Sequence, residues 1–385
     1  MAPLTWIVAL LLVAFTIRRY LYVVASLAPS REDARADRFS VAVIASFKDE
    51  EFALPHLLRC LAALDYPPQR VSFTLVSDGS SDCTQKILAD WVAATPNARV
   101  IATPDSRGKS EALNLALASA PASDLVAVYD ADTRPEASQL SWLAGAFDNS
   151  RVAAASGLLM PSNATASFVS RYAALENWVY QLVILAGKDR CGFNPPTVGS
   201  NCVYRRRELE AIGGFPPGSQ SEDIELSLVF VKRGLKTRWI HRAETRVLVA
   251  TTLSRFWRQR ARWTSGLYHS ARQARGPEGL LTVVGYVDRL ALLAAIALVI
   301  FGWLGPLWIV AYLAAPVVAS VSAVARARDT GAKWVYLFVA PPMFVVDIAA
   351  SLSSTLLSLI GRRVEWKTDR TDGHREIVSA KAADG

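Results

Sequence analysis

Residues 40–64 read SVAVIASFKDEEFALPHLLRCLAAL, and this stretch decides the fold class. It opens with a short apolar run at residues 41–45, which is typical of a strand covered on both faces. The leucines that follow recur at helical spacing until the segment ends before the YPP sequence at residues 66–68. A buried strand that leads into a helix is the repeating unit of a parallel sheet.

The same alternation continues through the first third of the chain. Strands are predicted at residues 71–78, 99–103 and 124–132, with helices at 83–94 and 108–120 between them. Short loops join these elements, which predicts an α/β fold with a doubly wound, mostly parallel sheet. Ligands of such sheets bind beyond the carboxyl ends of the strands. The polar residues that stand out fall at these ends or in the loops after them: Asp49, Asp78, Arg107, Asp130 and Asp132.

The composition indicates a protein that works at a membrane rather than on nucleic acid. Of the 385 residues 52% are hydrophobic, and the formal net charge is +8. Positive charge suits nucleic acid, a membrane surface or anionic substrates, but the sequence carries no RNP, zinc-finger or helix-turn-helix pattern. The four cysteines show neither CxxC spacing nor a disulfide framework, which favours a reducing compartment.

An N-terminal membrane anchor is predicted at residues 4–28, which are apolar apart from Arg18 and Arg19. A cleaved signal peptide carries its positive charge before the apolar run, whereas here the charges lie inside and after it. A retained anchor is therefore the better interpretation. Three further arginines between residues 31 and 38 place the following domain in the cytoplasm by the positive-inside rule.

Three more apolar runs follow at residues 290–301, 307–324 and 334–360. The first two are interpreted as membrane spans joined by a tight turn. The third contains Pro341-Pro342 and precedes a basic tail, which a single crossing would leave outside. We expect the proline pair to break this run into a re-entrant hairpin, with an additional interfacial segment as the alternative. The sequence therefore predicts a multi-pass protein of the cell membrane with five parts. These are an anchor and linker (1–37), an α/β domain (38–253), an interfacial region (254–287), C-terminal transmembrane segments (288–361) and a basic cytoplasmic tail (362–385).

The DAD sequence at residues 130–132 ends the fourth predicted strand. Residues i and i+2 of an extended chain face the same way, so Asp130 and Asp132 can converge on one point. Two carboxylates so close need a cation, and carboxylate oxygens suit Mg²⁺ or Mn²⁺. The alternative is a solvated surface DxD without a function.

Two loops permit a phosphate-binding interpretation and a structural one. Arg107 and Lys109 place cationic donors at the start of a helix, where phosphates bind, although an exposed loop explains them nearly as well. Asp78 begins a DGSSD loop, whose structural interpretation is an Asp-Gly turn.

The SED sequence at residues 221–223 begins another predicted helix. Ser221 could cap this helix, whose dipole favours Glu222 and Asp223 in the first turn. The functional alternative is that Asp223 is a general base, which deprotonates an attacking hydroxyl.

The segment RFWRQRARWTSG at residues 255–266 precedes the C-terminal apolar region. On a helix, Arg255, Arg258 and Arg262 share one narrow face. Such a helix either lies on anionic lipid headgroups or binds a phosphorylated ligand through its arginines. These residues alone do not decide between the two.

Taken together and in this order, six segments resemble the motifs of the processive-type family-2 glycosyltransferases. This group includes the membrane synthases of cellulose, chitin, hyaluronan and poly-N-acetylglucosamine. Lys48 stands where the family has Asn, Ser77 where it has Asp, and Ser221 where it has Thr. The matching segments are SFKDE (46–50), SDGSSD (77–82), RGKSEAL (107–113), DAD (130–132), SED (221–223) and QRARW (259–263).

The resemblance implies a GT-A fold and an inverting transfer of sugar from a UDP-sugar, assisted by Mg²⁺ or Mn²⁺. It also implies a role for each matching residue. These are nucleotide-sugar binding by Asp49, Asp78, Arg107, Lys109, Asp130, Gln259 and Arg262, metal binding by Asp132, acceptor binding by Trp263, and catalysis by Glu222 and Asp223, with Asp223 as the base.

Three functions remain open at this point. The first is a synthase that extends a polysaccharide with N-acetylglucosamine or glucose. The second is a single-addition enzyme that glycosylates a membrane lipid, as the ceramide and hopanoid glucosyltransferases do. The C-terminal apolar segments are few for a channel that would carry a polymer across the membrane. An accessory subunit or an oligomer could supply more helices, and a lipid acceptor would need no channel. The third is a non-enzymatic, membrane-anchored domain that senses nucleotides or acts as a scaffold, which is disfavoured because Asp132, Asp223 and Arg262 are all present.

Overall fold

The structure is a computed structural model, and it describes residues 2–29, 34–219, 221–274, 277–328 and 331–359. The described chain forms two compact units, each considered by itself. We call them the sheet unit and the helical unit. The sheet unit comprises the described residues of Ser30–Ala166 and Asn194–Thr251, and the helical unit those of Met1–Pro29, Ser167–Phe193 and Thr252–Val364.

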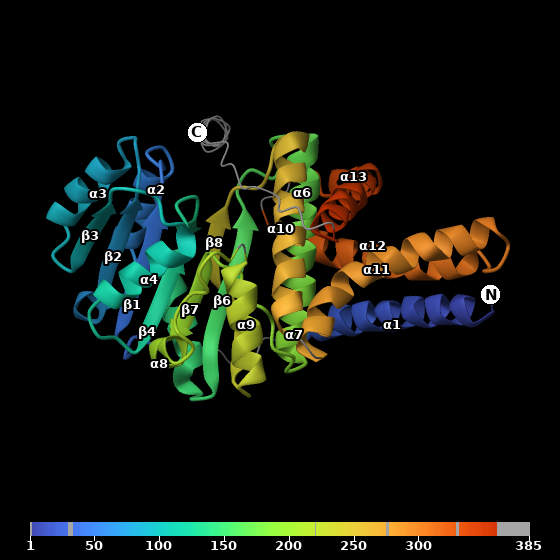
Figure 1. Cartoon of the computed structure of the whole chain (residues 1–385), viewed down its shortest axis with the longest axis horizontal. Coiled ribbons are helices and arrows are strands. Elements are labelled where there is room, and N and C mark those ends of the chain that lie inside the picture. The colour runs from blue at the N-terminus through green and yellow to red at the C-terminus, as the bar shows by residue number, and fades with distance from the viewer. Residues whose placement is uncertain (1, 30–33, 220, 275–276, 329–330, 360–385) are drawn as a thin grey trace. The chain divides into compact units, whose positions relative to one another are not determined.

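The sheet unit contains an eight-stranded sheet in the order β3-β2-β1-β4-β7-β6-β8-β5 (Figure 1). Strands β3, β2, β1 and β4 run parallel to one another. Strand β7 is antiparallel to both β4 and β6, β6 and β8 are parallel, and β5 is antiparallel to β8. The predicted mostly parallel α/β sheet is therefore confirmed. The strands are β1 (Val41–Phe47), β2 (Val71–Asp78), β3 (Ala98–Thr103), β4 (Leu125–Tyr129), β5 (Arg134–Pro135), β6 (Val152–Pro161), β7 (Asn201–Arg205) and β8 (Lys236–Val247).

Strand β1 shows why residues 41–45 are apolar at every position. Val41, Val43 and Ala45 belong to one hydrophobic cluster, while the alternate residues Ala42 and Ile44 belong to another on the opposite face. A strand with both faces covered has no position for a polar side chain. The continuous apolar run is thus the signature of a central strand.

Helices cover both faces of this sheet. In α2 (Leu54–Ala62) four leucines are buried in the first cluster, and each contributes about 1.5–3 kcal/mol relative to an exposed side chain. Helix α4 (Lys109–Ser119) buries Leu113 and Ala116 in the second cluster. The other helices of the unit are α3 (Thr84–Ala93), α5 (Gln139–Gly145), α8 (Arg206–Glu210) and α9 (Glu222–Lys232), with 3-10 turns η1 (Pro68–Arg70) and η2 (Ala146–Asp148).

The helical unit is built from long helices. Near the N-terminus, Leu12 and Phe15 pack with Ala295 and Tyr312 in its hydrophobic cluster. Helix α6 continues without a break into a π-helical segment, η3, and then into α7. The elements are α1 (Ala2–Leu27), α6 (Phe168–Trp178), η3 (Val179–Leu185), α7 (Ala186–Arg190), α10 (Leu253–Ala274), α11 (Pro277–Ile300), α12 (Leu307–Arg326) and α13 (Trp334–Leu359).

Three helices in the described part of the chain are long and apolar enough to cross a membrane: Pro3–Leu27, Leu307–Arg326 and Trp334–Leu357. The first and second agree with the anchor and with one predicted span. Of residues 290–301, predicted as a span, 290–300 form the end of α11 (Pro277–Ile300), which is not among these three helices. Their orientation stays a prediction, and residues 362–385, the expected basic tail, lie outside the described residues.

The expected re-entrant hairpin is wrong. Helix α13 runs from Trp334 to Leu359 with Pro341 and Pro342 inside it. A proline removes one helical hydrogen bond, whereas a break within an apolar segment would leave several backbone groups unpaired where water cannot reach them. The continuous helix therefore costs less free energy than a break would.

The compact units also cut across the expected domain boundaries. Ser167–Phe193, placed by the sequence inside the 38–253 domain, belongs to the helical unit. This segment is α6, η3 and α7, and it packs on α1, α12 and α13 rather than on a strand. The five-part division itself stays a prediction.

Candidate active site

The Asp78 carboxylate organises the loop that follows β3. It lies at the end of β2, is buried, and accepts hydrogen bonds from Ser106 Oγ at 2.8 Å, from the Arg107 amide at 2.8 Å and from the Gly108 amide at 3.0 Å. Gly79 permits this approach, because a Cβ there would meet the Ser106 amide nitrogen at 2.4 Å. Asp78 thus holds the loop that leads directly into Lys109, while the Arg107 side chain is exposed.

Asp49 links the end of β1 to the loop after β2. Its Oδ1 accepts hydrogen bonds from the amide of Ser81 at 2.6 Å and from Ser81 Oγ at 3.1 Å. Among the described residues it is the only non-glycine with positive φ, at 50°. Aspartate tolerates this conformation better than most residues do, and such backbone strain clusters at functional sites.

Lys109 joins three of the polar segments. Its Nζ lies 2.9 Å from Asp130 Oδ1, at the end of β4, and 2.8 Å from Glu222 Oε1, at the start of α9. Burial disfavours the charged amine, but the two carboxylates outweigh burial and raise the pKa of Lys109 above its usual value. The amine therefore stays positively charged at neutral pH. We call Lys109, Asp130, Glu222 and Asp223 the lysine cluster.

Asp223 follows Glu222 in the first turn of α9. Burial, and then the negative charge of Glu222, raise the pKa of Asp223 to about 7, although the Ile224 amide and Lys109 act in the opposite direction. A carboxyl group with a pKa near the working pH is suited to take up a proton, because it is both ionised and basic enough. The surroundings of Asp223 are thus those of a general base.

The loop before β7 fixes the position of Asp223. Thr197 Oγ1 and Ser227 Oγ donate to the Asp223 carbonyl oxygen at 3.0 Å and 2.8 Å. Gly199, with a φ of 64°, lies so close that a Cβ there would be 3.1 Å from Asp223 Oδ2. Sequence reasoning missed Thr197 and Gly199, and only the glycine in a loop hinted at them.

The capping interpretation of the SED sequence finds no support in the structure. Ser221 occupies the N-cap position of α9, but within the described chain its side chain forms no capping hydrogen bond. The two acids that follow it do lie in the first turn, where the helix dipole favours them.

The extended DAD sequence that we expected is not formed. Strand β4 ends at Tyr129, and a turn follows in which the amide and Oγ1 of Thr133 donate to the Asp130 carbonyl at 3.1 Å and 2.7 Å. The turn gives the two acids separate surroundings. Asp130 is half-buried beside Lys109, whereas Asp132 is exposed and lines a small hollow with His56 and Arg134.

The residues around Asp132 fit a cation that is shared with a ligand. The described residues contain no group of three or more His, Cys, Asp or Glu side chains that could hold a metal ion. Mg²⁺ is commonly bound by one or two carboxylates, with the remaining ligands supplied by phosphates and water. A single accessible aspartate meets that requirement.

Helix α10, in the helical unit, carries the QRARW sequence. Gln259 and Arg262 are half-buried, and the Trp263 side chain is 42% exposed. The guanidinium of Arg260 lies 4.9 Å from the Trp263 ring centre and 4.9 Å from that of Phe256. Arg260 therefore packs against the Trp263 ring, although the motif resemblance assigned roles only to Gln259, Arg262 and Trp263 of this segment.

A buried ionic network holds Arg260. It pairs with Glu176 of α6, and its Nε lies 2.9 Å from Asp347 Oδ1 of α13. Arg289 of α11 lies 2.6 Å from the other oxygen of Asp347. We call these four residues the arginine network. Sequence reasoning did not assign Arg260 a role, and the signal for it was Asp347, the one acid in the apolar helix α13.

Comparison with known proteins gives a consistent family. A model of the glycosyl transferase family group 2 matches residues 125–349. The probable glycosyltransferase YdaM of Bacillus subtilis is 29% identical over 231 residues, 59% of this chain and 54% of that protein. A beta-monoglucosyldiacylglycerol synthase of Trichormus variabilis is 25% identical over 234 residues (59% and 49%), and an N-acetylglucosaminyltransferase of Rhizobium meliloti is 25% identical over 235 residues (59% and 55%). The chain thus spans about half the length of these relatives.

A solved structure agrees with the fold. The mannosyltransferase PcManGT from Pyrobaculum calidifontis, in complex with GDP-Man and Mn²⁺, superposes with a TM-score of 0.64 at 19% identity, over 94% of this chain and all of that one. This likeness confirms the predicted GT-A type fold with flanking apolar helices. Since the family model covers more than half of the sequence, from β4 into α13, the chain belongs to glycosyl transferase family group 2.

Proposed function

We propose that this protein is a membrane-bound inverting glycosyltransferase that uses a UDP-sugar as donor and Asp223 as general base. The observation that carries the proposal is the lysine cluster. It joins the ends of β4, α4 and α9 around one amine and leaves an aspartate with a pKa near 7 beside it. Membership of the family supports transfer of a sugar as the reaction.

In the proposed reaction the hydroxyl oxygen of the acceptor attacks the anomeric carbon of the sugar. Asp223 takes the hydroxyl proton as the new bond forms, and the bond between the sugar and the phosphate breaks. The electron pair leaves with the diphosphate, so negative charge grows there. A divalent cation bound at Asp132 supplies compensating positive charge when present. Inversion needs no covalent intermediate, so one carboxylate base is enough.

The other residues have supporting roles in this proposal. Asp49 and Asp78 contact the nucleoside or hold the loops around it, and Lys109 keeps Asp130 and Glu222 in place beside the donor. For Gln259, Arg262 and Arg107 the proposed role, which rests on the motif resemblance alone, is binding of the nucleotide sugar. For Trp263 it is binding of the acceptor.

The donor sugar is proposed to be N-acetylglucosamine or glucose, and the acceptor a growing polysaccharide. One relative is named as an N-acetylglucosaminyltransferase, which supports the first sugar. The PcManGT structure holds GDP-Man and Mn²⁺, which supports a nucleotide sugar used with a divalent cation.

A glycolipid product is the second candidate, and a specific observation favours it. The relatives include beta-monoglucosyldiacylglycerol synthases, and the described chain contains three helices that could cross a membrane. A lipid acceptor needs no polymer channel, so these few helices suffice for it. A polysaccharide product would call for more helices from an accessory subunit or an oligomer.

The test is to incubate membranes that contain the protein with radiolabelled UDP-N-acetylglucosamine or UDP-glucose, with Mg²⁺, with Mn²⁺ or with EDTA. The proposal expects label to enter product, to stop in EDTA and to resume when the cation is restored. Polymer stays at the origin of a thin-layer plate, whereas a glycolipid extracts into organic solvent and migrates. Transfer that proceeds unchanged in EDTA would contradict the role of Asp132.

A further inference from the structure

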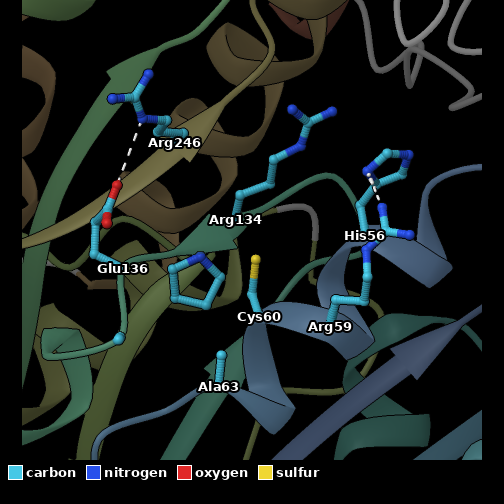
Figure 2. Close-up of a pocket in the computed structure, with 9 residues that line it drawn as sticks. His56, Arg59, Cys60, Ala63, Arg134, Glu136 and Arg246 are labelled. Carbon is cyan, nitrogen blue, oxygen red and sulfur yellow. Dashed lines mark hydrogen bonds and ion pairs between the residues drawn. The ribbon is translucent and has the colours of Figure 1, made fainter. Parts of the chain in front are cut away.

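A hollow of about 340 Å³ in the sheet unit lies apart from the lysine cluster (Figure 2). Helix α2, strand β5 with the residues after it, and strand β8 supply its walls. None of Asp49, Asp78, Lys109 and Asp223 lines it. Its polar lining consists of His56, Arg59, Cys60, Arg134, Glu136 and Arg246.

The hollow carries an excess of positive charge. Three arginines face one carboxylate, that of Glu136, which lies 3.5 Å from Arg246 Nε. Arg59 donates a hydrogen bond of 2.9 Å to His56 Nδ1, so its partner is a neutral ring. Arg134 forms no ion pair with any residue that the structure describes, and Figure 2 shows its guanidinium pointing away from Glu136. Arg59 and Arg134 therefore form no ion pair with the described residues, and the carboxylate of Asp132 lies in a smaller hollow that Arg134 also lines.

These features match the chemistry of a phosphate ligand. A guanidinium presents a planar fork of donors that binds phosphate oxygens in pairs, and several arginines around one space repel one another until an anion enters. The volume lies within the range of small-molecule sites. A second, smaller hollow connects this surface with the proposed metal residue, because His56 and Arg134 line it together with Asp132.

We propose that this hollow binds the phosphate group of a ligand other than the sugar donor. The phosphate belongs either to a lipid headgroup or to a soluble phosphate ester. The nearness of Asp132 places this ligand beside the proposed transfer site, but the binding itself does not depend on the proposed reaction.

Cys60 provides a reporter inside the hollow. Burial raises the pKa of the Cys60 thiol, and the positive charge of Arg134 opposes that shift. A bound phosphate blocks access to the thiol and, through its negative charge, further reduces the reactive thiolate. Cys83 and Cys191 are both replaced by serine, so that they do not react. The only cysteine left besides Cys60 is then Cys202, which is buried.

The experiment measures the alkylation rate of Cys60 by iodoacetamide in the full-length chain in detergent. Glycerol phosphate, phosphatidylglycerol in mixed micelles, and UDP are added in separate titrations. We expect a saturable decrease of the rate with a phosphate ester, and the more effective of the two esters identifies the source. No decrease with either ester, or a decrease with UDP at lower concentrations than with both esters, would overturn the proposal.

Arginine variants test the assignment of the hollow. Arg134→Gln and Arg246→Gln are each expected to weaken the protection about tenfold or more, the effect of losing a charged hydrogen bond. Arg99→Gln is the matched control, because Arg99 is an exposed arginine of the same unit that donates to the Ser119 carbonyl oxygen. Rates are measured from pH 7 to about 9 in each variant, so that a change in thiol pKa is separated from a change in binding. Equal protection in Arg134→Gln and Arg99→Gln would contradict the proposed site.

Discussion

The lysine cluster and the arginine network both bring four charged side chains together, yet they differ in balance. In the arginine network, Arg260 and Arg289 face Glu176 and Asp347, so positive and negative charges are equal in number. In the lysine cluster one amine faces Asp130, Glu222 and Asp223. The arginine network is also the more deeply buried, since Asp347 is 1% exposed and Arg260 6%.

This difference separates a positioning role from a reactive one. A balanced buried network pairs each charge with an opposite one, which suits a role in holding helices together. An unbalanced cluster leaves one acid without a cation of its own, which raises the pKa of that acid. Asp223 is that acid, and its burial together with the unbalanced charge of Glu222 raises its pKa to about 7.

The largest expected effect comes from Asp223→Asn, which removes the proposed base. We expect kcat for sugar transfer to fall about 10²–10⁴-fold, the usual contribution of a general base. Nucleotide binding and the thermal unfolding temperature should change little, because the amide keeps the shape and removes a charge that Glu222 repels. Asp90→Asn is the control, since Asp90 forms an exposed pair with Lys86. Normal transfer by Asp223→Asn would show that another group takes the proton.

The next effect concerns the arginine network. Asp347→Asn leaves Glu176 as the one acid of the network, facing the two arginines Arg260 and Arg289. Removal of one partner from a buried pair costs about 3–5 kcal/mol of stability. We expect a lower unfolding temperature in detergent and reduced transfer, because Arg260 no longer backs Trp263 in a fixed position.

The matched control for this variant is Glu210→Gln, which breaks the exposed pair between Arg206 and Glu210. An exposed pair at this helical spacing is worth about 0.3–0.5 kcal/mol, so the unfolding temperature should hardly move. Equal stability losses in the two variants would mean that the buried arginine network holds the fold no more strongly than an exposed ion pair does.

A smaller effect is expected from Gly199→Ala. The substitution costs about 1–2 kcal/mol because its φ is positive, and the new Cβ lies 3.1 Å from Asp223 Oδ2. Displacement of this carboxylate should lower kcat about tenfold and leave KM for the donor nearly unchanged. Gly234→Ala shares the positive φ but has open space around its Cβ, so it should lose stability without this loss of kcat. If both variants retain full kcat, the contact with Asp223 has no part in positioning it.

The sequence predicted the features that depend on local burial. Residues 41–45 of β1 are apolar at each position because both faces of the sheet are covered, and that pattern is visible without a structure. The polar residues at the ends of β1, β2 and β4 follow from the same sheet, since parallel strands end on one edge. The GT-A fold and the membership of the family agree with these predictions.

The features that the sequence missed depend on contacts between distant segments or on surroundings that the pattern does not encode. The extended DAD sequence was expected from strand spacing, but hydrogen bonds from Thr133 close a turn there. Arg260 looked like one arginine among several until Glu176 and Asp347 met it in space. A break at Pro341-Pro342 was expected because a single crossing would leave the basic tail outside, but the helix continues through both prolines and so keeps most of its backbone groups paired.

The pH dependence of kcat/KM tests the proposed base most directly. The pKa of Asp223 is raised from 3.8 to about 7, so the folded protein holds this proton at mildly acid pH and releases it as the pH rises. Only the ionised form can accept a proton, so kcat/KM should rise about tenfold per pH unit below pH 7 and level off above it. Glu222→Gln removes the charge that raises this pKa and should move the midpoint to lower pH. A flat profile between about pH 5.5 and 8, or a midpoint that does not move in Glu222→Gln, would contradict Asp223 as the base.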